Sequence, residues 1–183
     1  MKSSYHLNAA MTKPLVSVVI PVRNGKDYLQ EALDSVLQQS FTDLELLLIN
    51  DGSTDDNYDR YTLQDSRIRV IHLTGTGVSR ARNVGMAQSR GDLIAFLDAD
   101  DIWFPGKLMA QVQYFDSHPE TGVVFGKFIR WPALSEGGFA PASALTEDAS
   151  RLTAADPERS GWLYTRLLDG LLVGMNTAVT RRT

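Results

Sequence analysis

The strongest constraint on the fold is an alternation of short apolar segments with segments of helical periodicity. Four apolar segments have the length and β-branched character of buried strands, at residues 15–22, 44–50, about 67–73 and 92–98. Apolar residues recur at helical spacing in four intervening or following segments, at 24–40, near 56–64, 75–91 and 105–118. Buried strands joined by helical crossovers form a mainly parallel sheet with both faces covered. The sequence therefore predicts an α/β fold of Rossmann-like type, with helices flanking the sheet.

The ends of the chain do not follow this alternation. We interpret residues 1–13 as a tail and residues 14–183 as one domain. Within the domain, residues 132–159 are rich in Ala, Pro, Ser, Gly and Glu, which is typical of a variable loop. The patterns around this loop predict a strand or hairpin at 121–131, an amphipathic helix at 160–171 and a last strand at 173–183.

Charge and composition exclude several classes of protein. A net charge of −4 argues against a nucleic-acid partner bound through a broad basic face. The absence of cysteine excludes disulfides, thiol nucleophiles and cysteine metal sites. The N-terminus lacks the apolar core of a signal peptide, and no apolar run approaches the roughly 20 residues of a transmembrane segment. We expect a cytoplasmic location, either free or peripheral to the inner face of the membrane.

Three carboxylates follow the fourth predicted strand within four residues, at Asp98, Asp100 and Asp101. Like charges this close repel each other, and a divalent cation would remove the repulsion. Carboxylate oxygens suit Mg²⁺ or Mn²⁺, and alternation along an extended segment would place Asp98 and Asp100 on the same side. Helix capping is the alternative, and Asp101 alone could cap the next helix.

Two further polar motifs lie after predicted strands. In "NDGSTDD", Asp51 could accept hydrogen bonds from a nucleobase or ribose, although the same residue types also form turns. In "GVSRARNVG", Arg82 and Asn83 lie one helical turn past a Gly-rich loop, where a guanidinium could pair with phosphate. A helix with solvated arginines is the alternative there, and Arg80 fits it. Parallel sheets bind ligands outside the carboxyl ends of their strands, so these motifs are expected to form one site.

Taken in order, the motifs resemble those of the family 2 glycosyltransferases, which have the GT-A fold. The matching stretches are "VSVVIPVRNGKDYLQEALDSVLQQSF", "LELLLINDGSTDD" and "GVSRARNVGMAQSRGDLIAFLDADD", followed by a tryptophan and a helix. The resemblance is clear over about 15–130 and weak over 160–180. It implies a nucleotide-sugar donor, usually a UDP-sugar, a saccharide or lipid-linked acceptor, and a Mg or Mn divalent cation.

The resemblance also implies roles for individual residues. The implied nucleotide-binding residues are Pro21, Val22, Arg23, Asp51, Arg82, Asn83 and Asp98. Asp98 and Asp100 are implied as metal ligands, with Asp101 behind them. Asn50 stands where many relatives have aspartate, which leaves Asp51 as the residue expected to bind the base.

The family mechanism is inversion by direct displacement, in which a carboxylate base takes the proton of the acceptor hydroxyl. That base usually belongs to an acidic pair after a strand like "MNTAVTRR". No such pair follows here, so we expect the base beyond Thr183 and a domain truncated at its C-terminus. The pair Glu147 and Asp148 falls inside the variable loop, which makes Asp148 a weak candidate.

Two other functions use similar residues. A Mg-dependent nucleotidyltransferase also has an α/β sheet, but its Gly-rich, basic signature after the first strand is missing where "VRNGKD" stands. A non-catalytic domain that binds a nucleotide-sugar would have the same pocket, and only an activity measurement separates it from a transferase.

Overall fold

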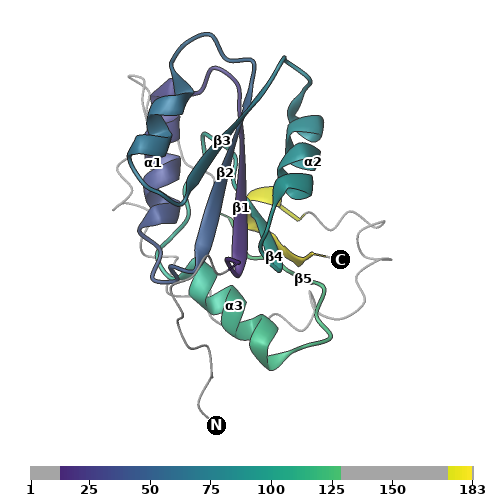
Figure 1. Ribbon diagram of the computed structural model, residues 1–183. Coiled ribbons are helices and arrows are strands. Elements are labelled where there is room, and N and C mark those ends of the chain that lie inside the picture. Colours follow the sequence, from purple (N-terminus) through teal and green to yellow (C-terminus); the bar gives the residue numbers. More distant parts are fainter. Residues whose placement is uncertain (1–12, 129–172, 183) are drawn as a thin grey trace, which may run out of the picture.

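The computed structural model describes residues 13–128 and 173–182, which form a six-stranded sheet in the order β3-β2-β1-β4-β6-β5 (Figure 1). The strands are β1 (Val16–Val22), β2 (Leu44–Asp51), β3 (Ile68–Leu73), β4 (Leu93–Phe96), β5 (Val123–Val124) and β6 (Val179–Arg181). β1 pairs in parallel with β2 and β4, and β2 pairs in parallel with β3. β6 runs antiparallel to both β4 and β5. The predicted mainly parallel sheet is confirmed.

Helices cover the sheet on both sides. They are α1 (Lys26–Leu37), α2 (Val78–Gln88) and α3 (Lys107–Ser117), with the 3₁₀ helices η1 (Tyr58–Leu63) and η4 (Met175–Thr177). Figure 1 shows α1 and α2 on opposite sides of the central strands, with α3 near the bottom of the view, below α1. Among the described residues, no helix is long and apolar enough to span a bilayer.

Strand β1 supplies side chains to two cores, because successive residues of a strand point to opposite faces. Val18 and Ile20 belong to the core that also contains residues of α1 and α3, such as Leu33 and Leu108. Val19 belongs to the second core, on the side of α2. There the helix comes so close that a Cβ at Gly85 would collide with Val19, so this contact requires glycine. The position of α2 beside the end of β1 depends on that contact.

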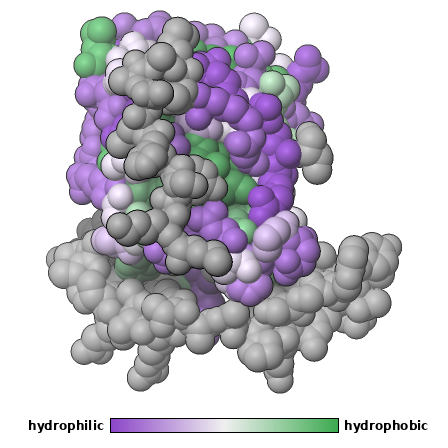
Figure 2. Space-filling model, turned by 60° about the horizontal axis from the view of Figure 1, so that its bottom comes forward, coloured by the Kyte–Doolittle hydropathy of each residue, from purple (hydrophilic) through white to green (hydrophobic). Residues whose placement is uncertain are grey.

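Exposed residues are mainly hydrophilic, as expected for strands that are buried on both faces. On the face shown in Figure 2, most described residues are hydrophilic and a smaller hydrophobic area lies among them. Large exposed hydrophobic side chains in the described part include Tyr28, Leu63 and Val78. Two of these, Tyr28 and Val78, border the candidate site described below.

Several boundaries differ from the predictions. β4 ends at Phe96, because residues 98–101 form a turn in which the Asp101 N–H donates to the Asp98 carbonyl at 3.1 Å. α3 begins at Lys107, after Pro105, so Asp101 does not cap it. Within the predicted strand 121–131, only Val123–Val124 has strand structure in the described part.

Other predictions fall on residues that the structure does not describe. These are most of the N-terminal tail, the loop at 132–159, the helix at 160–171, and with them Glu147 and Asp148. Whether the domain continues beyond Thr183 stays a prediction.

Candidate functional site

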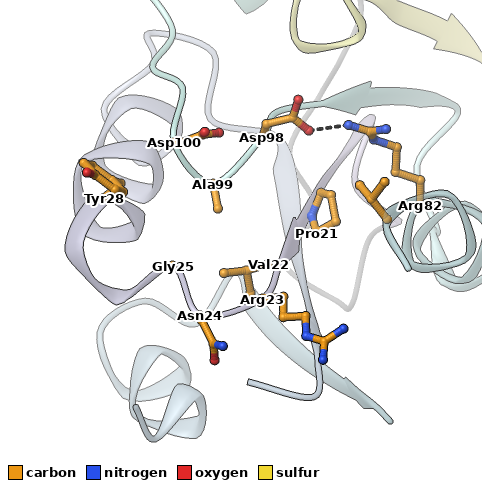
Figure 3. A pocket seen from close by; sticks show the side chains of 11 residues that line it. Pro21, Val22, Arg23, Asn24, Gly25, Tyr28, Arg82, Asp98, Ala99 and Asp100 are labelled. Atoms are coloured by element: carbon orange, nitrogen blue, oxygen red, sulfur yellow. Dashed lines mark hydrogen bonds and ion pairs between the residues drawn. The ribbon is translucent and has the colours of Figure 1, made fainter. Parts of the chain in front are cut away.

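A cavity of about 360 Å³ opens at the carboxyl ends of β1 and β4 (Figure 3). Six of its lining residues are ones that the sequence predicts for a nucleotide or metal site: Pro21, Val22, Arg23, Arg82, Asp98 and Asp100. They come from the end of β1, from α2 and from the turn after β4. The cavity has the size of a small-molecule site, and it lies at the sheet edge where parallel sheets bind ligands.

Arg82 and Asp98 form an ion pair inside this cavity. The Arg82 Nη2 donates to the Asp98 Oδ1 at 2.5 Å, from α2 to the turn after β4 (Figure 3). The Arg82 Nε is buried and has no hydrogen-bond partner among the described residues. An unpaired buried N–H costs about 1–3 kcal/mol. The rest of the Arg82 side chain is partly exposed to the cavity, where the guanidinium charge favours an anionic ligand.

The acidic turn supplies two carboxylates to the cavity, from Asp98 and Asp100. The sequence argument for this placement was alternation along an extended segment. That argument is wrong, because residues 98–101 form a turn. The described residues contain no cluster of three His, Asp or Glu side chains that could hold a metal by themselves. Mg²⁺ and Mn²⁺ sites at phosphates need fewer, since one or two carboxylates act together with phosphate oxygens and water. The two aspartates therefore fit a cation that is shared with a diphosphate.

Asp101 has a different environment from its two neighbours. It is absent from the cavity lining, and its Oδ2 accepts a hydrogen bond from the Asn176 Nδ2 at 2.5 Å. Burial raises the pKa of Asp101, and the nearby charges of Asp100 and Asp98 add to the effect. Asp101 thus lies outside the cavity lining, and its implied role behind the metal ligands stays a prediction.

Asp51, at the end of β2, is buried and fastened to the loop before α2. Its Oδ1 accepts hydrogen bonds from the Thr76 N–H at 2.6 Å and the Thr76 hydroxyl at 3.0 Å, and its Oδ2 accepts from the Gly77 N–H at 2.7 Å. The Thr76 N–H is the main cause that lowers the pKa of Asp51. Asp51 is not part of the cavity lining, so its contact with a base stays a prediction.

Asn83 does not line the cavity either. It lies exposed on α2, whereas Arg82 reaches the cavity. Consecutive residues of an α-helix point about 100° apart, since one turn contains 3.6 residues. Its proposed contact with the base or diphosphate is also untested.

Sequence reasoning missed five lining residues: Asn24, Gly25, Tyr28, Val78 and Ala99. Tyr28 fits the apolar spacing of α1, which is typical of a core position, yet it is 49% exposed. Asn24 directly precedes Gly25, the cap of α1. The signal that could have identified Asn24 is its position directly after β1, at the same sheet edge as Asp51 and Asp98.

The loops after β1 and β2 are joined by reciprocal hydrogen bonds around Asn24. The Asn24 N–H donates to the Ser53 hydroxyl at 3.0 Å, and the Asn24 Oδ1 accepts from the Thr54 N–H at 2.9 Å. Asp55 then accepts from the Lys26 N–H at 3.1 Å, at the start of α1. The segment "NDGSTDD" is therefore a turn that also holds the cavity-lining loop after β1 in place through these hydrogen bonds.

Comparisons with known proteins identify the family of this chain. The model of glycosyl transferase family 2 matches residues 17–133. The putative teichuronic acid biosynthesis glycosyltransferase TuaG of Bacillus subtilis (strain 168) is 40% identical over 152 residues, which are 77% of this chain and 59% of TuaG. Glycosyltransferase GlyG of Streptococcus pneumoniae serotype 4 is 35% identical over 129 residues, which are 68% of this chain and 42% of GlyG.

Solved structures show the same fold. S. aureus TarS 1–349 superposes with a TM-score of 0.66 at 24% identity, over 91% of this chain and 47% of that solved chain. The mannosyltransferase PcManGT from Pyrobaculum calidifontis, solved with GDP-Man and Mn²⁺, has a TM-score of 0.58 at 23% identity, over 65% of this chain and 37% of PcManGT. The chain thus has the GT-A fold and spans less than half the length of either solved chain. With the family model matched over residues 17–133, the chain belongs to glycosyl transferase family 2.

Proposed function

We propose that this chain is the donor-binding part of a glycosyltransferase that uses a UDP-sugar together with Mg²⁺ or Mn²⁺. One observation carries the proposal: the cavity at the carboxyl edge is lined by two arginines, Arg23 and Arg82, and by two aspartates, Asp98 and Asp100. A nucleoside diphosphate needs positive partners, and carboxylates in the same cavity need a cation between them and the phosphates. The nucleotidyltransferase alternative loses support because the family model matches residues 17–133.

Arg82 is the residue best placed to contact the diphosphate. One side of its guanidinium is held by Asp98, and its Nε is buried without a partner among the described residues. A planar guanidinium has five N–H donors, so it can bind a phosphate oxygen through an exposed one while it stays fixed by the carboxylate. Arg82 would thereby stabilise the charge that develops on the leaving diphosphate.

The hydrogen bonds of Asp51 support uracil over guanine as the base. A carboxylate has about four lone-pair sites. The loop before α2 already uses three through Thr76 and Gly77, and the Gly75 N–H also stabilises the carboxylate. At most one site is left, which suits the single ring N–H of uracil better than the two adjacent donors of guanine. The neighbour TarS, which has been solved with UDP and with UDP-GlcNAc, agrees with this proposal.

The chemistry that follows is transfer of the sugar to an acceptor hydroxyl with inversion. A cation held by Asp98 and Asp100 would supply charge neutralisation at the leaving diphosphate. The acceptor proton must go to a carboxylate base, which we do not assign among the described residues; Asp148 lies outside them. A saccharide or lipid-linked acceptor fits the family, but the described residues include no acceptor pocket that we can assign.

Calorimetry with UDP, in Mn²⁺ and in EDTA, tests the proposal on the chain of 183 residues. We expect Mn²⁺ to strengthen UDP binding by about tenfold or more, which is about 1.4 kcal/mol. Asp100→Ala should remove that gain, whereas Asp116→Ala, which removes an exposed carboxylate on α3, should keep it. Equal UDP affinity in both conditions would overturn the metal role, and no binding of UDP would overturn the donor proposal.

A further inference from the structure

Asn176 connects the acidic turn to the segment that leads into β6. It lies in η4, and its side-chain Nδ2 donates to the Asp101 Oδ2 at 2.5 Å. Its backbone carbonyl accepts a hydrogen bond from the Trp103 Nε1 at 2.8 Å. Asn176 therefore contacts both Asp101, the last residue of the acidic turn, and Trp103, which lies two residues after it.

The contact between Asn176 and Asp101 affects how the carboxylates of Asp98 and Asp100 are oriented, because all three aspartates belong to one turn. The Asp101 N–H closes the turn by donating to the Asp98 carbonyl at 3.1 Å. Asp98, Ala99 and Asp100 line the cavity, but Asp101 does not. Because its side chain is engaged by Asn176, Asp101 faces away from the cavity while the other two carboxylates face it.

Asn176 is itself held in a fixed place. Trp103 is 5% exposed, and its backbone N–H donates to the Ser35 hydroxyl of α1 at 3.1 Å. The Gln111 Nε2 of α3 donates to the carbonyl of Thr177, the residue after Asn176, at 2.9 Å. Contacts with α1 and α3 thus hold Asn176 and its neighbours in place against the turn, as a positioning role requires.

We propose that Asn176 is a positioning residue of the donor site, which orients Asp98 and Asp100 by anchoring Asp101. In this arrangement Asp101 is an anchor and does not bind the cation. The inference rests on the proposed function, because it concerns the cation shared with the diphosphate. It extends the donor site to a residue 75 positions along the chain from the acidic motif, on the far side of the segment 129–172.

A reciprocal exchange tests the anchor. Asn176→Asp places two carboxylates face to face, and Asp101→Asn places two amides face to face. The double variant restores one amide and one carboxylate, with donor and acceptor exchanged. UDP binding is measured in Mn²⁺ and in EDTA for all four proteins, with Asn57→Asp as a control that adds the same charge at the cap of η1.

We expect Asn176→Asp to weaken UDP binding in Mn²⁺ by about tenfold, a typical coupling for residues in direct contact, and to leave binding in EDTA unchanged. The UDP affinity of the double variant in Mn²⁺ should recover to within about twofold of the wild-type affinity. The control Asn57→Asp should bind UDP with the wild-type affinity. Equal losses in Mn²⁺ and EDTA would indicate a general disturbance and overturn the proposal. A double variant no better than Asp101→Asn would mean that the Asp101 carboxylate itself binds the cation, which also overturns it.

Urea unfolding of the same four proteins gives a readout that needs no nucleotide. Non-additive effects of the two single changes support the anchor, and additive effects overturn it. A wild-type chain with no Mn²⁺-dependent UDP binding would contradict the proposed function. The unfolding cycle would then still decide whether Asn176 anchors the turn.

Discussion

Asp51 accepts two hydrogen bonds from Thr76, one from the backbone N–H at 2.6 Å and one from the hydroxyl at 3.0 Å. A third bond, from the Gly77 N–H, completes the attachment of β2 to the loop before α2. Backbone N–H groups near a helix N-terminus often bind a phosphate. Here a carboxylate of the chain binds them instead, so the Gly-rich loop is fixed before any ligand arrives.

Asp51→Asn should destabilise the fold at neutral pH, because an amide N–H₂ then faces backbone donors. We expect a loss of about 1–3 kcal/mol in the free energy of unfolding. The fold lowers the pKa of Asp51 below its ordinary value of 3.8, so the carboxylate stabilises the fold above that pH. This contribution is lost as the pH falls through the folded pKa. The difference in the free energy of unfolding between wild type and Asp51→Asn should therefore shrink at that pH.

Urea unfolding at neutral pH and at about pH 3 checks this dependence, with the exposed Asp43→Asn as the matched control. Asp43→Asn should change little at either pH. A gap between wild type and Asp51→Asn that stayed constant down to pH 3 would contradict the role of the Asp51 charge.

Base selectivity gives a second test of the Asp51 contacts. Thr76→Val removes the hydroxyl donor but keeps the backbone N–H, which frees one lone-pair site on the Asp51 Oδ1. We expect UDP affinity to stay within about threefold and the preference for UDP over GDP to narrow. Asp51→Ala should weaken UDP by roughly 1–3 kcal/mol and also erode the preference. Competition binding of UDP and GDP measures both, and an unchanged preference in both variants would place the base elsewhere.

Arg82→Lys tests the guanidinium in the cavity. Lysine keeps the charge but loses the fork that can hold Asp98 and a phosphate together. We expect UDP binding to weaken by ~1.5–3 kcal/mol, the range for hydrogen bonds to charged groups. Arg80→Lys, on the exposed side of α2, is the control and should bind UDP like the wild type. If the two variants lost the same affinity, general charge attraction would explain binding and Arg82 would have no special role.

Asn24 has a positive φ of 53°, which is unfavourable for most residues but common for asparagine. Both Asn24→Gly and Asn24→Ala lose the bond from the Thr54 N–H. Only alanine adds backbone strain, so Asn24→Ala should be the less stable of the two by about 1–2 kcal/mol. Thermal unfolding compares the pair, and equal stability would mean that the loop relaxes to a negative φ.

The sequence predicts the central strands well, because burial on both faces leaves a continuous apolar run, whereas β5 and β6 are much shorter than predicted. β1 and β2 begin and end within about one residue of the prediction, an accuracy that assignment methods themselves share. The boundary of β4 was predicted two residues too far, because alternation cannot detect the turn that Asp101 closes. Tyr28 was missed since apolar spacing on a helix does not distinguish a core residue from the wall of a cavity.

Contacts between distant residues could not be predicted. Asp51 and Thr76 are separated by 25 residues and Asp101 and Asn176 by 75, and neither spacing carries a pattern. Polar side chains at the sheet edge are identifiable from one sequence as a group. Which of them bind a ligand and which bind each other depends on the loops, whose geometry a single sequence does not specify.

Lys107 should make stability depend on pH above neutrality. Its Nζ lies 3.9 Å from the centre of the Trp103 ring and donates to the Gln111 Oε1 at 2.8 Å. Although the residue as a whole is only partly buried, burial of the amine lowers the pKa from 10.5 to about 7. Between these two values the unfolded chain binds a proton that the fold does not, so the free energy of unfolding rises with pH.

Lys107→Met removes the titrating group and keeps an apolar chain over Trp103. The stability of wild type relative to this variant should therefore rise by about 1–2 kcal/mol between pH 7 and pH 9, somewhat less than the limit of about 1.4 kcal/mol per pH unit. Lys127→Met, at an exposed lysine, should run parallel to the wild type over the same range. Urea unfolding at several pH values gives all three curves. If the Lys107→Met curve also ran parallel to the wild-type curve, the amine would keep its proton in the fold. The attraction between the cation and the Trp103 ring would then exceed the energetic cost of burying the charge.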